Sequence, residues 1–124
     1  MDETTFLDAA EDGDIKLIRE GLNSGLDADT ADSHQRTALM KSAKHGHFDI
    51  VQLLINEGAD VNARDNRGTS ALYWASSNGH HDIVQLLIQN HSDVHVMDDR
   101  GWSAKDQAST HNHDDIVQLL ESAK

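Results

Sequence analysis

Nine histidines are the clearest candidates for chemistry in this sequence, because imidazole binds metals and transfers protons near neutral pH. His47, His80 and His113 recur every 33 residues, and His80-His81 and His111-x-His113 form close pairs. If each period folds as one packed helical unit, the recurrent histidines lie roughly 8 to 10 Å apart, too far to share a zinc ion with bonds of about 2 Å. Neither close pair has a third ligand at suitable spacing. We therefore expect a structural role for the recurrent histidines, and neither a metal site nor any other cofactor.

Other catalytic arrangements are also missing from the sequence. The chain contains no cysteine, which excludes disulfides, thiolate metal sites and a cysteine nucleophile. It has no Gly-rich phosphate loop, nucleophile elbow or paired-carboxylate site. Adjacent aspartates at 98–99 and 114–115 are expected in a turn and at a helix start, where carboxylates favour the helix dipole. We therefore expect a protein that is not an enzyme, with a histidine-based enzyme or metal carrier as the least favoured alternative.

The 33-residue period extends beyond the histidines and organises the whole chain. The heptamer Asp-Ile-Val-Gln-Leu-Leu-Ile occupies residues 49–55 and again 82–88, and its first six residues return at 115–120. A Gly-His pair precedes both complete heptamers. Self-similarity at a fixed period is typical of repeat architectures. We predict a single domain over residues 1–124, built from repeats of about 4–35, 36–68, 69–101 and 102–124.

Each repeat is predicted to form two short helices bounded by turn residues. The first helix begins at a hydroxyl N-cap and ends near a residue that tolerates the left-handed conformation. The second helix contains the heptamer, which is apolar almost all round and must be covered on more than one side. Helices this short are marginal alone, so we expect an all-α repeat solenoid in which units stack on their neighbours. The N-caps are Thr37, Ser70 and Ser103, and the helix ends are Gly13, Gly46, Gly79 and Asn112.

A 33-residue unit with Gly-His, Asp-Ile-Val-Gln-Leu-Leu and, at 58–63, Gly-Ala-Asp-Val-Asn-Ala resembles the ankyrin repeat. The resemblance covers nearly the whole chain. It implies stacked helix–turn–helix units with β-hairpin fingers that project roughly at right angles from the helices. It also implies a non-catalytic scaffold whose concave surface, made by the fingers and inner helices, binds partner proteins.

The sequence departs from the ankyrin pattern at several positions. The family's helix opening Thr-Pro-Leu-His appears here as Thr-Ala-Leu-Met, Ser-Ala-Leu-Tyr and Ser-Ala-Lys-Asp. Gln35 stands where the later fingers have Gly68 and Gly101, and His91 replaces the residue equivalent to Gly58. If the backbone at Gln35 still needs a positive φ, the penalty is on the order of 1 kcal/mol. We therefore expect the first finger to be the loosest, and His91→Gly to raise the melting temperature.

Both end repeats differ from the inner ones. Glu20-Gly21 stand where later copies have Leu-Leu, and Lys105, Asp106 and Gln107 replace mainly apolar residues of the inner first helices. Polar outer faces are required at the ends of a solenoid. We therefore expect capped ends and a complete protein.

The concave face of the expected solenoid combines basic and aromatic residues. Seven of the ten Lys and Arg residues fall in fingers or first helices, and the second helices carry none after Arg19. Trp and Arg are enriched in binding hot spots, so we hypothesise a patch that grips an acidic or amphipathic partner. In the alternative interpretation, Trp74 and Tyr73 fill space between inner helices and the arginines are solvated. The candidate partner-binding residues are His34, Arg36, Lys41, Lys44, His45, Arg67, Thr69, Tyr73, Trp74, Ser77, Arg100, Trp102 and His111.

Charge and hydropathy restrict the class of partner. The net charge of −12 argues against nucleic acid, whose phosphates it repels. No apolar run approaches the roughly 18 to 20 residues of a membrane span. The N-terminus lacks the basic and apolar regions of a secretory signal. We therefore expect a soluble cytoplasmic monomer that binds another protein and neither nucleic acid nor a membrane.

Two alternatives to a general protein-binding scaffold stay open. A dedicated inhibitor or immunity-type protein would occlude the active site of an enzyme or toxin. The binding surface is a second open point, because ten of the 22 carboxylates fall in the first 32 residues. Asp8, Glu11, Asp12 and Asp14 would either attract a basic partner or solubilise the end of the stack.

Overall fold

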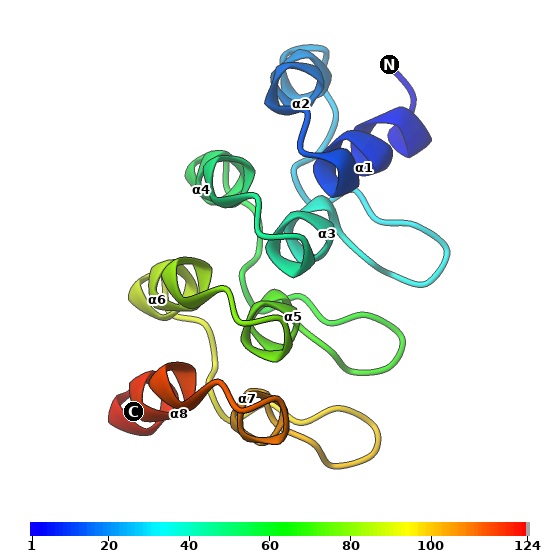
Figure 1. Cartoon of the computed structure of the whole chain (residues 1–124). Coiled ribbons are helices and arrows are strands. Elements are labelled where there is room, and N and C mark those ends of the chain that lie inside the picture. Colours follow the sequence, from blue (N-terminus) through cyan, green and yellow to red (C-terminus); the bar gives the residue numbers. More distant parts are fainter. Residues whose placement is uncertain (124) are drawn as a thin grey trace.

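A computed structural model describes residues 1–123 and shows a repeat solenoid of paired helices (Figure 1). Eight helices follow one another over these residues, two in each predicted repeat. They are α1 (Glu3–Asp12), α2 (Ile15–Asn23), α3 (Ala38–Lys44), α4 (Phe48–Asn56), α5 (Ala71–Ser77), α6 (His81–Gln89), α7 (Ala104–Thr110) and α8 (Asp114–Ser122). The all-α repeat solenoid predicted from the 33-residue period is confirmed.

The helices form two layers, with the long loops on one side (Figure 1). Helices α1, α3, α5 and α7 contact one another in order and form the inner layer, while α2, α4, α6 and α8 form the outer layer. Three loops project from the inner layer, away from the outer helices. We call them the first finger (residues 31–37), the second finger (64–70) and the third finger (97–103).

The fingers differ from the β-hairpins that the resemblance implied. Within residues 1–123 there is no regular strand, and isolated bridges in the first and third fingers are the only β pairing. An aspartate closes each finger instead. In the second finger, Asp65 donates its N–H to the carbonyl of Thr69 (2.9 Å), and its own carbonyl accepts the N–H of Gly68 (3.0 Å). These short loops end before a ladder of strand pairs can form.

The inner helices α3, α5 and α7 begin at the predicted N-caps and end two residues before the predicted end residues. Thr37 caps α3 by accepting the N–H of Met40 (3.3 Å), and Ser70 caps α5 in the same way. Ser103 caps α7, and Asp106 returns a bond to the Ser103 N–H, which completes a capping box. The predicted end residues all have positive φ, namely Gly13, Gly46, Gly79 and Asn112.

Two more non-glycine residues adopt positive φ, at the positions where the sequence departs from the family pattern. Gln35 has a φ of 63° in the first finger, and Gly68, its equivalent in the second finger, has a φ of 78°. His91 has a φ of 72°, against 91° at Gly58. Gln35 and His91 therefore keep the positive φ that glycine adopts at the equivalent positions. This conformation is strained in both residues, because each has a Cβ.

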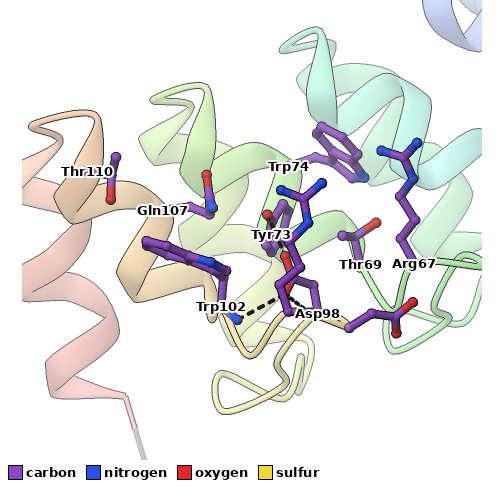
Figure 2. Close-up of a pocket in the computed structure, with 10 residues that line it drawn as sticks. Arg67, Thr69, Tyr73, Trp74, Asp98, Trp102, Gln107 and Thr110 are labelled. Atoms are coloured by element: carbon purple, nitrogen blue, oxygen red, sulfur yellow. Dashed lines mark hydrogen bonds between the residues drawn. The ribbon is translucent and has the colours of Figure 1, made fainter.

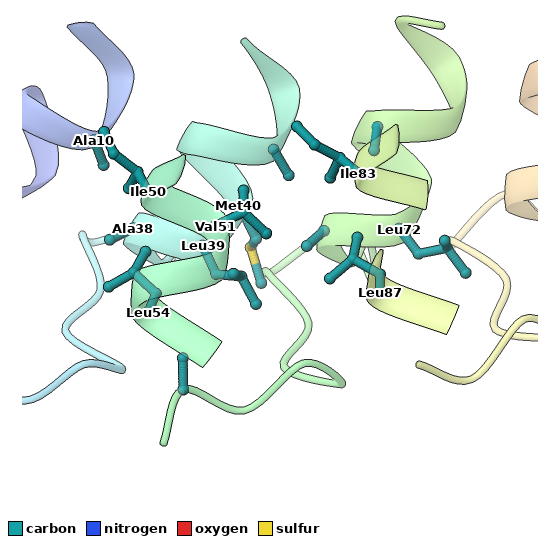
Figure 3. Packing of buried hydrophobic residues seen from close by; sticks show 14 of the residues in the cluster. Ala10, Ala38, Leu39, Met40, Ile50, Val51, Leu54, Leu72, Ile83 and Leu87 are labelled. Atoms are coloured by element: carbon teal, nitrogen blue, oxygen red, sulfur yellow. The ribbon is translucent and has the colours of Figure 1, made fainter. Parts of the chain in front are cut away.

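The core lies between the two helix layers (Figure 3). Ile50, Val51 and Leu54 of α4 are buried against the inner helices, and the identical heptamer buries the equivalent residues of α6. Leu39 and Leu72 meet them from the inner layer. The buried stripe of each outer helix thus recurs with the sequence period. Among residues 1–123, no helix is long and apolar enough to cross a membrane.

Each of the three recurrent histidines forms a hydrogen bond to the preceding repeat. Nε2 of His47 donates to the Glu11 carbonyl (2.8 Å), and Nε2 of His80 donates to the Lys44 carbonyl (3.0 Å). His113 makes the same bond to the preceding unit (3.2 Å). A Cβ at Gly46 would lie 2.7 Å from the His80 ring, so glycine is needed there for space as well as for its φ. The structural role expected for these three histidines is confirmed.

Candidate functional site

A groove opens on the finger side of the molecule, across the third and fourth repeats (Figure 2). Its volume is about 530 Å³. The helices α5 and α7 and the second and third fingers supply its walls. Residues that line it are Arg67, Thr69, Tyr73, Trp74, Asp98, Asp99, Arg100, Trp102, Gln107 and Thr110. Six of the thirteen candidate residues thus line one groove.

Asp98 positions the part of the groove that the third finger supplies. Its Oδ1 accepts the backbone N–H groups of both Arg100 and Trp102, each at 2.9 Å. Asp65 holds Arg67 and Thr69 in the same way in the second finger. The backbones of these two pairs are therefore fixed by the finger loops themselves, one repeat apart.

The hydrogen bonds in the fingers keep these aspartates ionised. Burial would raise the pKa of Asp98, but hydrogen bonds from Trp102, Tyr73 and Arg100, together with the Arg100 charge, outweigh it and lower that pKa below its ordinary value. The pKa of Asp65 is also lowered, because bonds from Thr69, Arg67 and Arg36 outweigh its burial. Both carboxylates are charged at neutral pH.

Tyr73 ties α5 to the third finger. Its hydroxyl donates to Oδ2 of Asp98 at 2.9 Å. Burial, followed by the bond to Asp98 and the charge of that carboxylate, raises the pKa of Tyr73 to about 12. The Tyr73 ring also meets Trp74 edge to face, with centroids 5.6 Å apart. Tyr73 is therefore part of the frame that shapes the groove.

The two tryptophans of the chain both line this groove, with Tyr73 between them in the view of Figure 2. Trp102 is 42% exposed on the third finger. Trp74 is partly buried, and Nζ of Lys44 lies 4.9 Å from its ring centroid, within cation–π range. Trp74 also lines a smaller hollow with Arg36, Lys41 and Lys44. Of the surface aromatics, the indoles and the phenol are thus gathered at one place.

The cations expected to form a basic strip fall into two sets. Arg36 lies 3.5 Å from Oδ2 of Asp65, and Lys41 lies 3.2 Å from Oδ2 of Asp32, so finger aspartates balance both charges. Arg67 and Arg100 have no ion pair or side-chain hydrogen bond within residues 1–123. Arg67 and Arg100 therefore bring unpaired positive charge to the groove, while Lys44 and Arg64, which also lack an ion pair in the described residues, are not part of its lining.

This arrangement of helix pairs and finger loops agrees with a comparison against known families. A family model described as ankyrin repeats (3 copies) matches residues 6–98 and, in a second alignment, residues 65–124. The chain belongs to the ankyrin-repeat family. Ankyrin repeats are generally protein–protein interaction modules and typically non-catalytic scaffolds. No curated protein matches the sequence significantly.

Several candidate residues lie outside the groove of this ankyrin stack. His34 is exposed in the first finger, and His45 Nε2 lies 3.5 Å from Oε1 of Glu11. Ser77 donates to the Gln107 side chain at 3.4 Å, and the His111 ring bonds to the Gln107 carbonyl at 2.8 Å. None of these four residues lines the groove, although Ser77 and His111 bond to Gln107, which does.

Thr69 differs from the expectation that it belongs to an exposed strip. It is only 4% exposed, and its N–H donates to the carboxylate of Asp65 at 2.9 Å. A buried finger residue of this kind supports the floor of the groove and offers a partner little surface.

The part that Asp98 plays in the groove was not predicted from the sequence. Asp98 was expected in a turn, without contacts to Tyr73, Arg100 or Trp102. A signal was present, because Asp32, Asp65 and Asp98 follow one another at the ankyrin period. Recurrence at a turn position indicates a backbone-capping aspartate. Its bond to Tyr73 crosses 25 residues and has no counterpart in the sequence pattern.

Proposed function

We propose that the protein is a non-catalytic scaffold that binds another protein in the groove of its third and fourth repeats. The observation that carries the proposal is the convergence there of both tryptophans, the tyrosine and two unpaired arginines. Trp, Tyr and Arg are the residue types that dominate binding hot spots. A pocket of this size with mixed apolar and charged walls suits side chains of a partner. On the grounds of composition, we also propose that it works as a cytoplasmic monomer.

Affinity capture with mass spectrometry tests this proposal. The immobilised chain is compared with a groove variant in which Arg67, Trp74, Arg100 and Trp102 are changed to alanine. A control variant changes exposed residues of the outer helices to alanine, namely Lys16, Gln52, Gln85 and Gln118. We expect partners to be retained by the wild type and the control and lost from the groove variant.

A triple variant distinguishes loss of partner binding from loss of folding in the capture test. Trp74 is partly buried, so its loss will loosen packing, whereas Arg67, Arg100 and Trp102 are exposed. The triple change of the exposed residues to alanine should leave the helical circular dichroism spectrum and its melting curve close to those of the wild type. Undiminished capture by this folded triple variant would sink the proposed groove function.

A second candidate is a dedicated inhibitor or immunity-type protein that covers a basic enzyme or toxin. The exposed carboxylates of Asp8, Glu11 and Asp12 on α1 favour it, because they form a negative face that speeds association with a cationic partner. Neutralising the three residues to Asn, Gln and Asn should then abolish inhibition of the captured enzyme. If groove variants alone remove inhibition, the acidic face is a solubilising cap.

A further inference from the structure

The aromatic part of the groove is suited to one apolar side chain of a partner. Trp102 stands 42% exposed on a finger, where no neighbouring repeat needs its indole for packing. Trp74 and Trp102 lie on opposite sides of Tyr73 in Figure 2, and the rings of Tyr73 and Trp74 meet edge to face. We call these three side chains the aromatic wall. Covering an exposed indole with apolar atoms is favourable, because aromatic side chains bury large areas.

Two cations, Arg67 and Arg100, and two carboxylates, Asp98 and Asp99, line the groove. Lys44, Arg67 and Arg100 form no salt bridge within the part of the chain that the structure describes, although the protein as a whole carries a net charge of −12. Asp98 accepts three hydrogen bonds from the protein itself, so its oxygens are already occupied. Asp99 is the remaining exposed carboxylate of the groove.

A cationic partner side chain fits this groove poorly. An aromatic wall attracts cations, but the ammonium of Lys44 already lies over the Trp74 ring. Arg67 and Arg100 would repel a second positive charge beside them. Carboxylates suit the two guanidinium groups better, because arginine binds them through paired, charge-assisted hydrogen bonds.

Building on the function proposed above, we propose that the groove recognises a short acidic segment of the partner protein that carries one apolar side chain. The apolar side chain packs against Trp74 and Trp102, and flanking carboxylates bind Arg67 and Arg100. The volume of about 530 Å³ admits a few side chains, which is the size of a short linear segment.

Intrinsic fluorescence of the full chain tests the proposal, because both tryptophans line the groove. The probe is a short end-blocked peptide in which glutamates flank a single leucine. Its comparison peptides replace the glutamates by lysine or the leucine by serine, and an oligothymidylate represents nucleic acid. We expect a saturable spectral change with the Glu–Leu peptide that weakens as salt is added, and affinity at least about tenfold lower for the serine peptide.

Matched variants show which charges are responsible. The double variant R67Q/R100Q removes the two groove arginines, and K16Q/K105Q removes two exposed lysines outside the groove. The net charge changes equally in both. By calorimetry we expect R67Q/R100Q to weaken binding of the Glu–Leu peptide by at least about tenfold, and K16Q/K105Q by less than about twofold.

Three results would overturn the acidic-segment proposal: no saturable change at millimolar Glu–Leu peptide, equal weakening by the two double variants, or tighter binding of the lysine peptide or the oligothymidylate. The proposed function fails separately, in the capture experiment. If partner capture needs the groove but the Glu–Leu peptide does not bind, the scaffold function stands and this choice of partner chemistry is wrong.

Discussion

Three single residues with a left-handed backbone place conformational strain in the turns of this stack. Gln35, His91 and Asn112 have positive φ, where a Cβ crowds the following carbonyl. At Gly58, the residue equivalent to His91, an added Cβ would meet nothing within 4 Å. The cost at His91 is therefore backbone strain, with no compensating packing visible at that equivalent position.

His91→Gly is predicted to stabilise the protein. Relief of left-handed strain gains about 1 kcal/mol or somewhat more, and the flexibility of glycine in the unfolded chain offsets part of it. We expect the melting temperature to rise by a few degrees, about 2 to 5 °C. Gly58→Ala is the matched reverse change and should lower it by a similar amount. A melting curve in which His91→Gly is less stable than the wild type contradicts the strain argument.

Tyr73 provides a titration that reports on the groove. The folded protein holds its pKa at about 12, above the value of about 10 for an exposed tyrosine. A raised folded pKa means that Tyr73 contributes stability below about pH 10 that is lost as pH rises toward 12. Ultraviolet absorbance should therefore show this single tyrosine ionising near pH 12, above the ordinary value.

Asp98→Asn should lower the midpoint of that titration, because it removes the negative charge beside the phenol. Asp99→Asn is the control, since the neighbouring Asp99 carboxylate makes no bond to Tyr73. Circular dichroism checks that the helices persist over the pH range. A midpoint at the ordinary value in the folded wild type would show that Tyr73 and Asp98 are not bonded.

At the scale of elements, the fingers depend on aspartates that accept backbone N–H groups more than on strand pairing. The carboxylate of Asp65 accepts the N–H groups of Arg67 and Thr69 and lies 3.5 Å from Arg36 of the preceding finger. Asn66 then donates its N–H to the carbonyl of His34, which joins the two fingers directly. One carboxylate thus organises its own loop and its contact with a neighbour.

Asp65→Ala is predicted to destabilise the protein by roughly 2 to 4 kcal/mol, because two N–H groups and Arg36 lose their partner. Asp65→Asn keeps an acceptor oxygen and should cost less. The lowered pKa of Asp65 stabilises the fold above the ordinary pKa, and this stability is lost as pH falls through the folded pKa. Urea unfolding below about pH 4 should therefore show a shallower pH dependence for Asp65→Asn than for the wild type. An Asp65→Ala variant as stable as Asp99→Ala would contradict the capping role.

At the scale of the whole molecule, stability comes from contacts between neighbouring repeats. Helices of seven to ten residues are marginal alone, and the inner helices contact one another in sequence along the stack. The bond from His80 to the Lys44 carbonyl lies at the central interface, between the second and third repeats. His113 makes the equivalent bond at the last interface.

His80→Ala is predicted to lower the free energy of unfolding by about 1 to 3 kcal/mol, through loss of the hydrogen bond and of ring packing. The same change at His113 should have a smaller effect on the main transition, because it detaches only the last repeat. Urea unfolding followed by circular dichroism compares the two. An equal loss of unfolding free energy in the two variants would contradict the prediction that the central interface contributes more than the last one.

Much of the fold could be predicted because it is encoded locally and repeated. The N-caps Thr37, Ser70 and Ser103 and the left-handed residues depend on groups within a few positions of each other. The β-hairpin fingers were wrong because the resemblance supplied them, while the actual loops close through aspartate side chains. The uniform basic strip was also too simple, because Arg36 and Lys41 are paired with carboxylates on the fingers.

The sequence by itself determined the period, the helix boundaries, the family and the residue types available on the finger side. These features can be predicted because helix caps, positive φ and apolar stripes depend on residues close together in the sequence. The same residues recur in each repeat. Only the tertiary structure decided which surface residues converge. Tyr73, Trp74 and Arg67 come from the third repeat or the finger that leads into it, while Arg100 and Trp102 belong to the next finger. Their meeting, and the pairing of other cations elsewhere, depends on how one repeat is placed on another, which no single repeat specifies.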